Sequence, residues 1–91
     1  MSARYLRREP LDALEVDGEA LLLLPPDQVV RLSPIGTAIF AASAGPTAVE
    51  AIAVLIEAEF GAPGDGDALA AVSEFCADLA RAGVLERVAD E

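Results

Sequence analysis

The sequence contains no histidine and no lysine, and these absences leave few ways to build an active site. General bases and Schiff-base nucleophiles are most often drawn from these residue types, so catalysis would have to rest on carboxylates. Asp65 and Asp67 flank a glycine in a predicted loop. Glu57 and Glu59 are two positions apart on a predicted helix and point in different directions. Neither pair suits acid–base chemistry or metal binding, so we expect a protein that is not an enzyme.

Cysteine is nearly absent as well, since Cys76 is the one thiol of the chain. It allows no internal disulfide and fits a reducing cytosol. With no histidine beside it, it leaves too few ligands for a zinc site, and the sequence predicts no metal and no cofactor. Cys76 lies in the apolar stripe of a predicted helix with no cation near it in sequence. We expect it to pack in the core as an inert thiol.

Long hydrophobic runs are also missing from the sequence. The longest apolar run, residues 20–26, is far short of the ~20 residues that a membrane span requires. The chain does not open with the charged and apolar regions of an export signal. We therefore expect a cytoplasmic protein that does not enter a membrane.

Positive charge is scarce, because sixteen acidic residues face six arginines and the formal net charge is -10. Binding to nucleic acid depends on clustered cations that release counterions from the phosphates, so nucleic acid is not an expected partner. Three of the arginines, Arg4, Arg7 and Arg8, fall within residues 1–10. We interpret residues 1–10 as an N-terminal tail, either solvated or serving as a docking arm for an acidic partner.

The first half of the predicted domain has the pattern of three short strands. Two apolar stretches within residues 11–24 are joined by Asp17-Gly18, a dipeptide that accepts the positive φ angles of a hairpin turn. The second stretch is apolar on both faces, as expected of a strand in the middle of a sheet. Pro25-Pro26 then forces a reversal, and the chain returns as a strand over residues 28–32. The prediction is a three-stranded antiparallel meander.

Three helices are predicted to follow the strands. Ser33 before Pro34 favours a helix start, with a stripe of Ile35, Ile39 and Ala42 toward the core. Residues 47–50, TAVE, have the pattern of a capping box for a second helix that ends at Gly61. The apolar stripe of that second helix is predicted to contain Val49, Ile52, Ala53, Ile56 and Phe60.

The third predicted helix begins after a surface loop at residues 61–66, is capped by Asp67 and runs to Ala82. It has two apolar stripes, which indicate either deep burial or one flank in the core and a second flank left open as a groove. Residues 84–88 form either a small strand or part of a tail. The fold class is therefore α+β, with helices covering one face of a small sheet. The first stripe contains Leu69, Val72, Cys76 and Leu79, and the second contains Ala68, Ala71, Phe75 and Ala82.

Three stretches of the sequence resemble the PqqD family: LSPIGTAIF, then TAVE before AIAVLIEAEFG, and AVSEFCADLARAGVL. This family comprises peptide-binding domains also known as RiPP precursor recognition elements, including the leader-binding proteins of lasso-peptide clusters. The resemblance spans residues 11–85. The sequence departs from the family pattern at Cys76, where leucine is common, at Ser33-Pro34, where Asn-Pro is frequent, and at Ala71, where an acid is frequent. These departures leave the subfamily open.

The resemblance implies a winged-helix-like peptide-binding domain over residues 11–88, flanked by tails at 1–10 and 89–91. It implies a non-catalytic peptide chaperone that binds the leader of a ribosomally made precursor peptide and presents it to a maturation enzyme such as a leader peptidase, a macrocyclase or a radical maturase. In the family, the leader adds as a strand beside the third strand, in the cleft formed with the third helix. Carried over to this chain, the pairing falls on Gln28, Val29, Val30, Arg31 and Leu32, and the apolar wall on Val72, Phe75, Cys76 and Leu79.

Two other functions remain open from the sequence. An open strand edge also suits a protein–protein adaptor that docks an enzyme without binding a leader. A winged-helix DNA-binding protein would share much of the architecture, but its recognition helix should be basic. The third helix instead has one arginine against Asp67, Glu74 and Asp78, which disfavours DNA binding.

Overall fold

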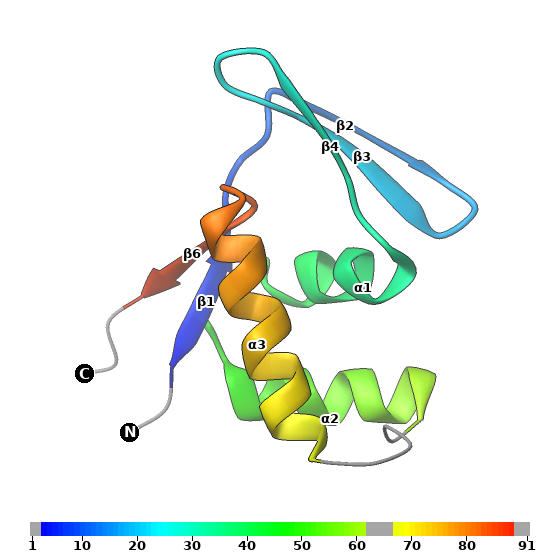
Figure 1. The fold of residues 1–91 in the computed structure, drawn as a ribbon, viewed down its shortest axis with the longest axis vertical. Coiled ribbons are helices and arrows are strands. Elements are labelled where there is room, and N and C mark those ends of the chain that lie inside the picture. The colour runs from blue at the N-terminus through cyan, green and yellow to red at the C-terminus, as the bar shows by residue number, and fades with distance from the viewer. Residues whose placement is uncertain (1–2, 62–66, 89–91) are drawn as a thin grey trace.

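The structure is a computed structural model that describes residues 3–61 and 67–88, and it has the predicted α+β class (Figure 1). A meander of strands packs on the first of three helices, the helices pack on one another, and a second small sheet lies beside them. In chain order the elements are β1 (Arg4–Arg7), β2 (Asp12–Val16), β3 (Glu19–Leu24), β4 (Gln28–Arg31), α1 (Pro34–Ala42), β5 (Thr47–Ala48), α2 (Val49–Phe60), α3 (Ala68–Arg81) and β6 (Leu85–Val88).

The predicted three-stranded meander is confirmed. Its strand order is β2-β3-β4, and both pairings are antiparallel. Asp17 and Gly18 occupy the β2–β3 turn with φ values of 53° and 78°, as a tight hairpin turn requires. Leu22 of β3 lies opposite Ala13 of β2 and Val30 of β4, so the all-apolar strand is the central one.

The N-terminal segment differs from the predicted tail, because part of residues 1–10 forms a strand. β1 pairs with both β5 and β6, in a second sheet of order β5-β1-β6. Tyr5 is buried at 5% exposure, which gives the segment an apolar anchor. The Arg7 N–H donates to the Ser43 carbonyl at 2.8 Å, and the Arg7 guanidinium lies 5.2 Å from the centre of the Phe40 ring.

The start of α1 follows the prediction, whereas the start of α2 does not. The Ser33 hydroxyl accepts from the Gly36 N–H at 3.1 Å, with Pro34 in the first turn. The predicted capping box at residues 47–50 is wrong, because Thr47 belongs to β5 and its hydroxyl donates to the carbonyls of Ala42 and Gly45. The cap position of α2 is Ala48, which has no side chain able to cap.

The remaining helix boundaries agree with the sequence where they are described. α2 ends at Gly61, which has a φ of 87°. Asp67 caps α3 by accepting from the Leu69 N–H at 3.0 Å. Most of the predicted loop, residues 62–66, lies outside the described residues, as do residues 89–91. Of the two alternatives for residues 84–88, the structure has the strand, β6.

The core is formed by the inner face of the meander, the three helices and the second sheet, which contributes Tyr5 and Leu85. Three predicted core positions are less buried than expected: Phe60 is 40% exposed, while Ile35 and Ala42 are half-buried. Phe60 is the last residue of α2 and borders open hollows, which explains its exposure. The buried apolar residues are Tyr5, Ala20, Leu22, Leu24, Leu32, Ile39, Phe40, Val49, Ile52, Ala53, Ile56, Val72, Cys76, Leu79, Val84 and Leu85.

Candidate functional site

β4 is an edge strand. It pairs with β3 on one side, and no strand within residues 3–61 and 67–88 pairs with its other side. The Leu32 N–H donates to the Ala20 carbonyl at 2.8 Å, so the backbone of Leu32 faces β3. Because backbone groups alternate along an antiparallel strand, the backbone of Val30 also faces β3, whereas the N–H and C=O groups of Val29 and Arg31 face away from the sheet. These outward groups are available to a further strand.

Side chains of β4 alternate between the two faces of the meander. Val30 is half-buried and Leu32 is 3% exposed, since they share the inner face with buried Leu22. Val29 is 68% exposed and lies with Arg31 on the outer face. Gln28 is also exposed. The strand is thus held by its inner side chains and leaves its outward backbone groups uncovered.

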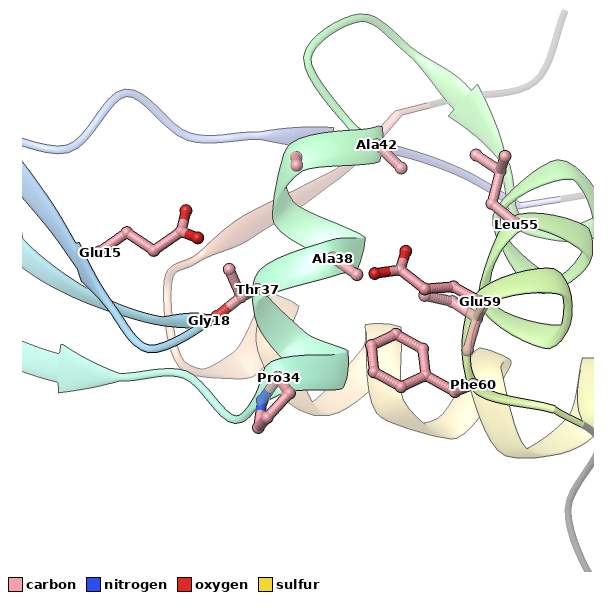
Figure 2. A pocket seen from close by; sticks show the side chains of 11 residues that line it. Glu15, Gly18, Pro34, Thr37, Ala38, Ala42, Leu55, Glu59 and Phe60 are labelled. Carbon is pink, nitrogen blue, oxygen red and sulfur yellow. The ribbon is translucent and has the colours of Figure 1, made fainter.

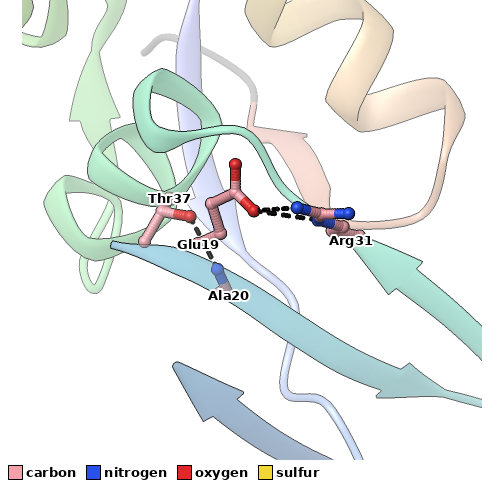
Figure 3. A network of polar contacts seen from close by, with 4 residues as sticks. All are labelled: Glu19, Ala20, Arg31 and Thr37. Atoms are coloured by element: carbon pink, nitrogen blue, oxygen red, sulfur yellow. Dashed lines mark hydrogen bonds and ion pairs between the residues drawn. The ribbon is translucent and has the colours of Figure 1, made fainter. Parts of the chain in front are cut away.

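The ion pair of Arg31 ties β4 to the centre of the sheet (Figure 3). The Arg31 Nε donates to Glu19 Oε1 at 2.9 Å, across the β3–β4 pair. Next to it, the Ala20 N–H donates to the Thr37 hydroxyl at 2.9 Å, which joins β3 to α1 (Figure 3). Arg31 therefore has a carboxylate partner within the protein, and its charge is directed along the outer face.

α3 reaches the C-terminal end of β4 through Phe75. A Cβ built on Gly36 would lie 3.5 Å from Phe75 Cε1 and 3.5 Å from Leu32 Cβ, so the ring lies against the chain just after β4. Gly36 leaves the space that brings these two side chains together. The residue of α3 that lies nearest to Gly36 is therefore an aromatic one.

The other end of β4 lies near the end of α3. A Cβ built on Gly83 would lie 3.9 Å from Leu24 Cδ1, and Leu24 is paired with Gln28. Phe75 of α3 thus lies near Leu32, and Gly83, just after α3, lies near the strand residue that pairs with Gln28.

The predicted wall on α3 is only partly accessible. Val72, Cys76 and Leu79 are 5%, 0% and 7% exposed, so they belong to the core and offer almost no surface to a guest. Phe75 alone of the four expected residues is half-buried. A spacing of three and four residues places Ala71 on the side of α3 that presents Phe75, and Ala71 is exposed. The accessible flank is therefore the second stripe, and the first stripe supports it from inside.

Burial governs the chemistry of Cys76. Loss of water raises the pKa of its thiol to about 11 from the usual 9.0, because the thiolate would be unsolvated in the core. The thiol is therefore protonated at neutral pH and shielded, and it has neither the charge nor the access of a reactive cysteine.

The raised pKa of Cys76 makes the stability of the protein depend on alkaline pH. Below pH 9 both folded and unfolded thiols are protonated, so this contribution is constant. Between pH 9 and about 11 the unfolded thiol ionises first, and we expect the free energy of unfolding to fall by about 2 to 3 kcal/mol. Urea denaturation at pH 8 and pH 10.5 measures the fall.

Cys76→Ala is the control for this pH effect, since it retains every other titrating group. The extra alkaline loss of stability should be absent from the variant. An equal loss in both proteins, or rapid labelling of folded Cys76 by a disulfide reagent at pH 8, would show that the thiol is not shielded.

A large hollow of about 530 Å³ lies away from the β4 edge, between α1, α2 and the β2–β3 turn (Figure 2). Figure 2 shows Glu59 and Phe60 of α2 opposite Ala38 and Thr37 of α1. No residue of β4 lines the hollow. Its two carboxylates, Glu15 and Glu59, come from different elements, and no group of three or more potential metal ligands is found in the described part of the chain.

The structure is a small α+β domain in which β4 is an edge strand and α3 has an accessible apolar flank. Edges of this kind bind extended peptides by strand addition in several unrelated folds. The model of the PqqD family, described as coenzyme PQQ synthesis protein D, matches residues 20–85. The chain belongs to the PqqD family, a family of RiPP recognition elements. The match covers β3, β4 and all three helices, which are the elements of the candidate site.

Comparisons with curated proteins and with solved structures gave no match. Among the described residues, no helix has both the length and the apolar character needed to cross a membrane. A functional proposal therefore rests on two findings, the family match and the geometry of β4 and α3.

Proposed function

We propose that this protein binds the leader of a ribosomally synthesised precursor peptide as an added strand along β4 and presents it to a maturation enzyme. The observation that carries the proposal is the pair of outward-facing backbone positions, Val29 and Arg31. The half-buried ring of Phe75 lies near Leu32, where the strand ends. Family membership supports it, since PqqD proteins are recognition elements for such peptides. The proposed role is non-catalytic and cytoplasmic, with no cofactor.

The residues of the expected site take different parts in this proposal. Val29 and Arg31 would pair with the guest, while Gln28, Val30 and Leu32 hold β4 on β3. Phe75 would contact guest side chains directly. Val72, Cys76 and Leu79 would fix the position of Phe75 from the core rather than touch the guest.

Strand pairing alone would bind weakly. Two outward residues offer about four backbone hydrogen bonds, each contributing about 1 kcal/mol net. Association costs about 4 to 15 kcal/mol, so these hydrogen bonds alone do not compensate for the free energy lost on binding. Two or three apolar side chains of the guest, each contributing about 1.5 to 3 kcal/mol on burial, are needed as anchors. The inward-pointing guest residues would meet Phe75 and half-buried Val30.

The leader-binding unit in this proposal lies within residues 11–88 and is winged-helix-like, with α3 as the helix beside the guest. β1 would stabilise the unit without contacting the guest, because its sheet is separate from the meander. α3 is not suited to DNA in this arrangement, since its basic residue, Arg81, is paired with Asp78.

An adaptor that docks an enzyme without binding a leader is the second candidate, and one observation favours it. The outer face of the meander exposes large apolar side chains: Leu14 is 61%, Val16 is 51% and Val29 is 68% exposed. The register places all three on one face of the sheet. Such a patch suits a protein partner, and in the first proposal it would serve the maturation enzyme.

A proline at position 29 tests strand addition. Val29→Pro removes an outward N–H without removing a bond to β3, and edge strands tolerate proline at such positions. We expect it to weaken binding of labelled leader peptides, taken from short reading frames beside the gene, by tenfold or more in fluorescence anisotropy. Backbone amide exchange at Arg31 should slow when wild-type protein binds the peptide.

Glu15→Pro is the matched control, because Glu15 occupies the corresponding outward position on the opposite edge, β2. It should leave leader affinity within about twofold, and both variants should melt within a few degrees of the wild type. Equal affinity of wild type and Val29→Pro would contradict strand addition at β4. Absence of binding by the wild type to any of the leaders would favour the adaptor.

A further inference from the structure

The large hollow between α1, α2 and the β2–β3 turn has no part in the proposed function, and its floor extends along the whole of α1 (Figure 2). The floor is one face of that helix, because its residues follow spacings of three and four. All of them have short side chains, so the backbone of a partner can approach α1 closely. The face spans about 13 Å. These floor residues are Pro34, Thr37, Ala38, Ala41 and Ala42.

One wall of the hollow is an apolar strip on α2. Leu55 is 52% and Phe60 is 40% exposed, and both side chains line the hollow. Large apolar side chains that are exposed at a concave surface are typical of a site for another protein. The water that covers them would be released when apolar groups of a partner bind there.

Two carboxylates border this apolar surface. Figure 2 shows Glu15 of β2 and Glu59 of α2 pointing toward α1 from its two sides. Within the described residues, neither carboxylate has a hydrogen bond or an ion pair. The net charge of the protein is -10, so its own cations are few and the matching charges have to come from a partner. The chemistry of the hollow therefore selects an apolar surface with basic groups on both flanks.

The lining of the hollow favours a helix over an extended segment as the occupant. Apart from Glu15 and Gly18, the lining residues belong to α1 and α2. Backbone groups of a helix are bonded within it, so the hollow offers few backbone partners to an extended chain. A helix needs no such partners and can lay one apolar face along α1, as amphipathic helices do in apolar grooves.

A second copy of this chain does not supply such a helix within the described residues. α1 has no charged side chain, and the charged side chains of α2 are all acidic. α3 has one basic residue, Arg81, which forms an ion pair with Asp78. The large negative charge also opposes self-association at this surface. These features favour a different protein as the occupant.

We propose that this hollow docks a basic amphipathic helix of a partner protein. The apolar face of that helix would lie on α1 and against Leu55 and Phe60. Its arginine or lysine side chains would pair with Glu15 and Glu59. Docking here does not require strand addition, because no residue of β4 lines the hollow. A partner helix in the hollow would leave β4 open for a guest peptide.

A model peptide tests the hollow without a known partner. The probe is a peptide of about 18 leucine and lysine residues, long enough to form a helix and ordered so that one helical face is leucine. We expect it to bind the full-length protein with saturation. It should shift the ¹³C methyl signals of Leu55 and Ile56 more than those of Leu14 and Val29. No saturable binding, or larger shifts at Leu14 and Val29, overturns the proposal.

Two further peptides test the other occupants. A peptide of the same pattern interrupted by two prolines cannot form the helix and should bind at least tenfold more weakly. A peptide with glutamate in place of lysine keeps the apolar face and should show no saturable binding. Equal affinity of the proline peptide would assign the hollow to an extended segment, and equal affinity of the glutamate peptide would leave the carboxylates without a role. Either result overturns the proposal.

Ala41→Arg is the blocking variant, because Ala41 is exposed on the floor of the hollow. A long cationic side chain there fills the groove and repels the lysines of the probe, so we expect the affinity to fall at least tenfold. Ala70→Arg adds the same charge at an exposed position of α3 outside the hollow and should change the affinity about twofold or less. Both variants should melt within a few degrees of the wild type. Equal affinities of the two variants overturn the proposal.

Charge removal separates the two carboxylates from the overall charge of the protein. Glu15→Gln and Glu59→Gln combined in one protein should weaken binding of the lysine–leucine peptide about fivefold, as expected for two exposed ion pairs. Glu74→Gln combined with Glu86→Gln removes the same charge at exposed positions outside the hollow and should weaken binding less than twofold. Equal losses would mean that the peptide responds to net charge alone, which contradicts docking at this hollow.

The two proposals fail independently. Val29→Pro should leave binding of the lysine–leucine peptide unchanged, and Ala41→Arg should leave binding of leader peptides unchanged. If leader binding survives Val29→Pro, strand addition is wrong, and the hollow is still judged by Ala41→Arg. If Val29→Pro and Ala41→Arg weaken the lysine–leucine peptide equally, the hollow is not its binding site.

Discussion

We expect a variant that lacks residues 1–8 to be largely unfolded at room temperature and to show no cooperative unfolding transition on heating. The deletion removes β1, which pairs with β5 and β6 and contributes the buried ring of Tyr5. Removal of a buried aromatic side chain costs about 3 to 5 kcal/mol, and the lost strand pairing adds to this. Since small domains are stable by about 5 to 15 kcal/mol, the loss is comparable to the whole stability. Circular dichroism on heating measures it.

Two point variants separate the anchor from the rest of the segment. Tyr5→Ala should lower the melting temperature by more than 10 °C, because it empties a core position. Tyr5→Phe retains the ring and should melt close to the wild type. If the deletion variant melts like the wild type, the segment is a tail in solution and β1 does not contribute to the fold.

The second sheet was missed in the sequence because nothing local encodes it. β1 has the residues RYLR, with one buried side chain in four positions, a pattern shared by many exposed tails. Its pairing partners are distant: Arg4 lies opposite Ala48 and also opposite Val88. The meander, by contrast, has its turn signal at Asp17-Gly18 and adjacent partners, so short-range reasoning was enough to predict it.

Only part of the candidate site could be predicted from the sequence, because the burial of a helix face also depends on distant contacts. The sequence predicts the meander, and the family resemblance implies that its last strand is an open edge; in the structure that strand, β4, is at the edge of the sheet. The accessible face of α3 cannot be predicted in this way, because helical periodicity shows which residues share a face but not which of two apolar faces the core covers. The resemblance puts the wall on residues of both stripes, and of these Val72, Cys76 and Leu79 are buried. Phe75 of the second stripe keeps accessible surface. Three-dimensional contacts at Gly36 were needed to decide between the two faces.

The capping prediction at Thr47 is also wrong because of a nonlocal contact. The TAVE pattern fits a capping box, and the same hydroxyl also fits a turn that donates to preceding carbonyls. In the structure, the Thr47 hydroxyl donates to the carbonyls of Ala42 and Gly45, and the residue pairs with Tyr5 of β1. The nonlocal pairing of β1 draws Thr47 into β5, so the capping geometry is lost.

Truncation of Leu22 is the second change expected to have a large effect. Leu22 is 1% exposed at the centre of the meander, between Ala13 and Val30 on the neighbouring strands. Leu22→Ala leaves a cavity under the helices and should cost about 3 to 4 kcal/mol. For a domain of this size, that is a fall in melting temperature of at least 10 °C. Urea and thermal denaturation measure both quantities.

Leu23→Ala is the matched control, because the same substitution one residue later falls on the opposite face of the same strand. Leu23 is half-buried on the outer face, so its truncation should cost about 1 kcal/mol or less. The ratio of the two costs reports which face of the meander the helices cover. Comparable losses from both variants would mean that the outer face is also packed, by a second copy or by a partner already bound, and the exposed patch of Leu14, Val16 and Val29 would not be free to receive a maturation enzyme.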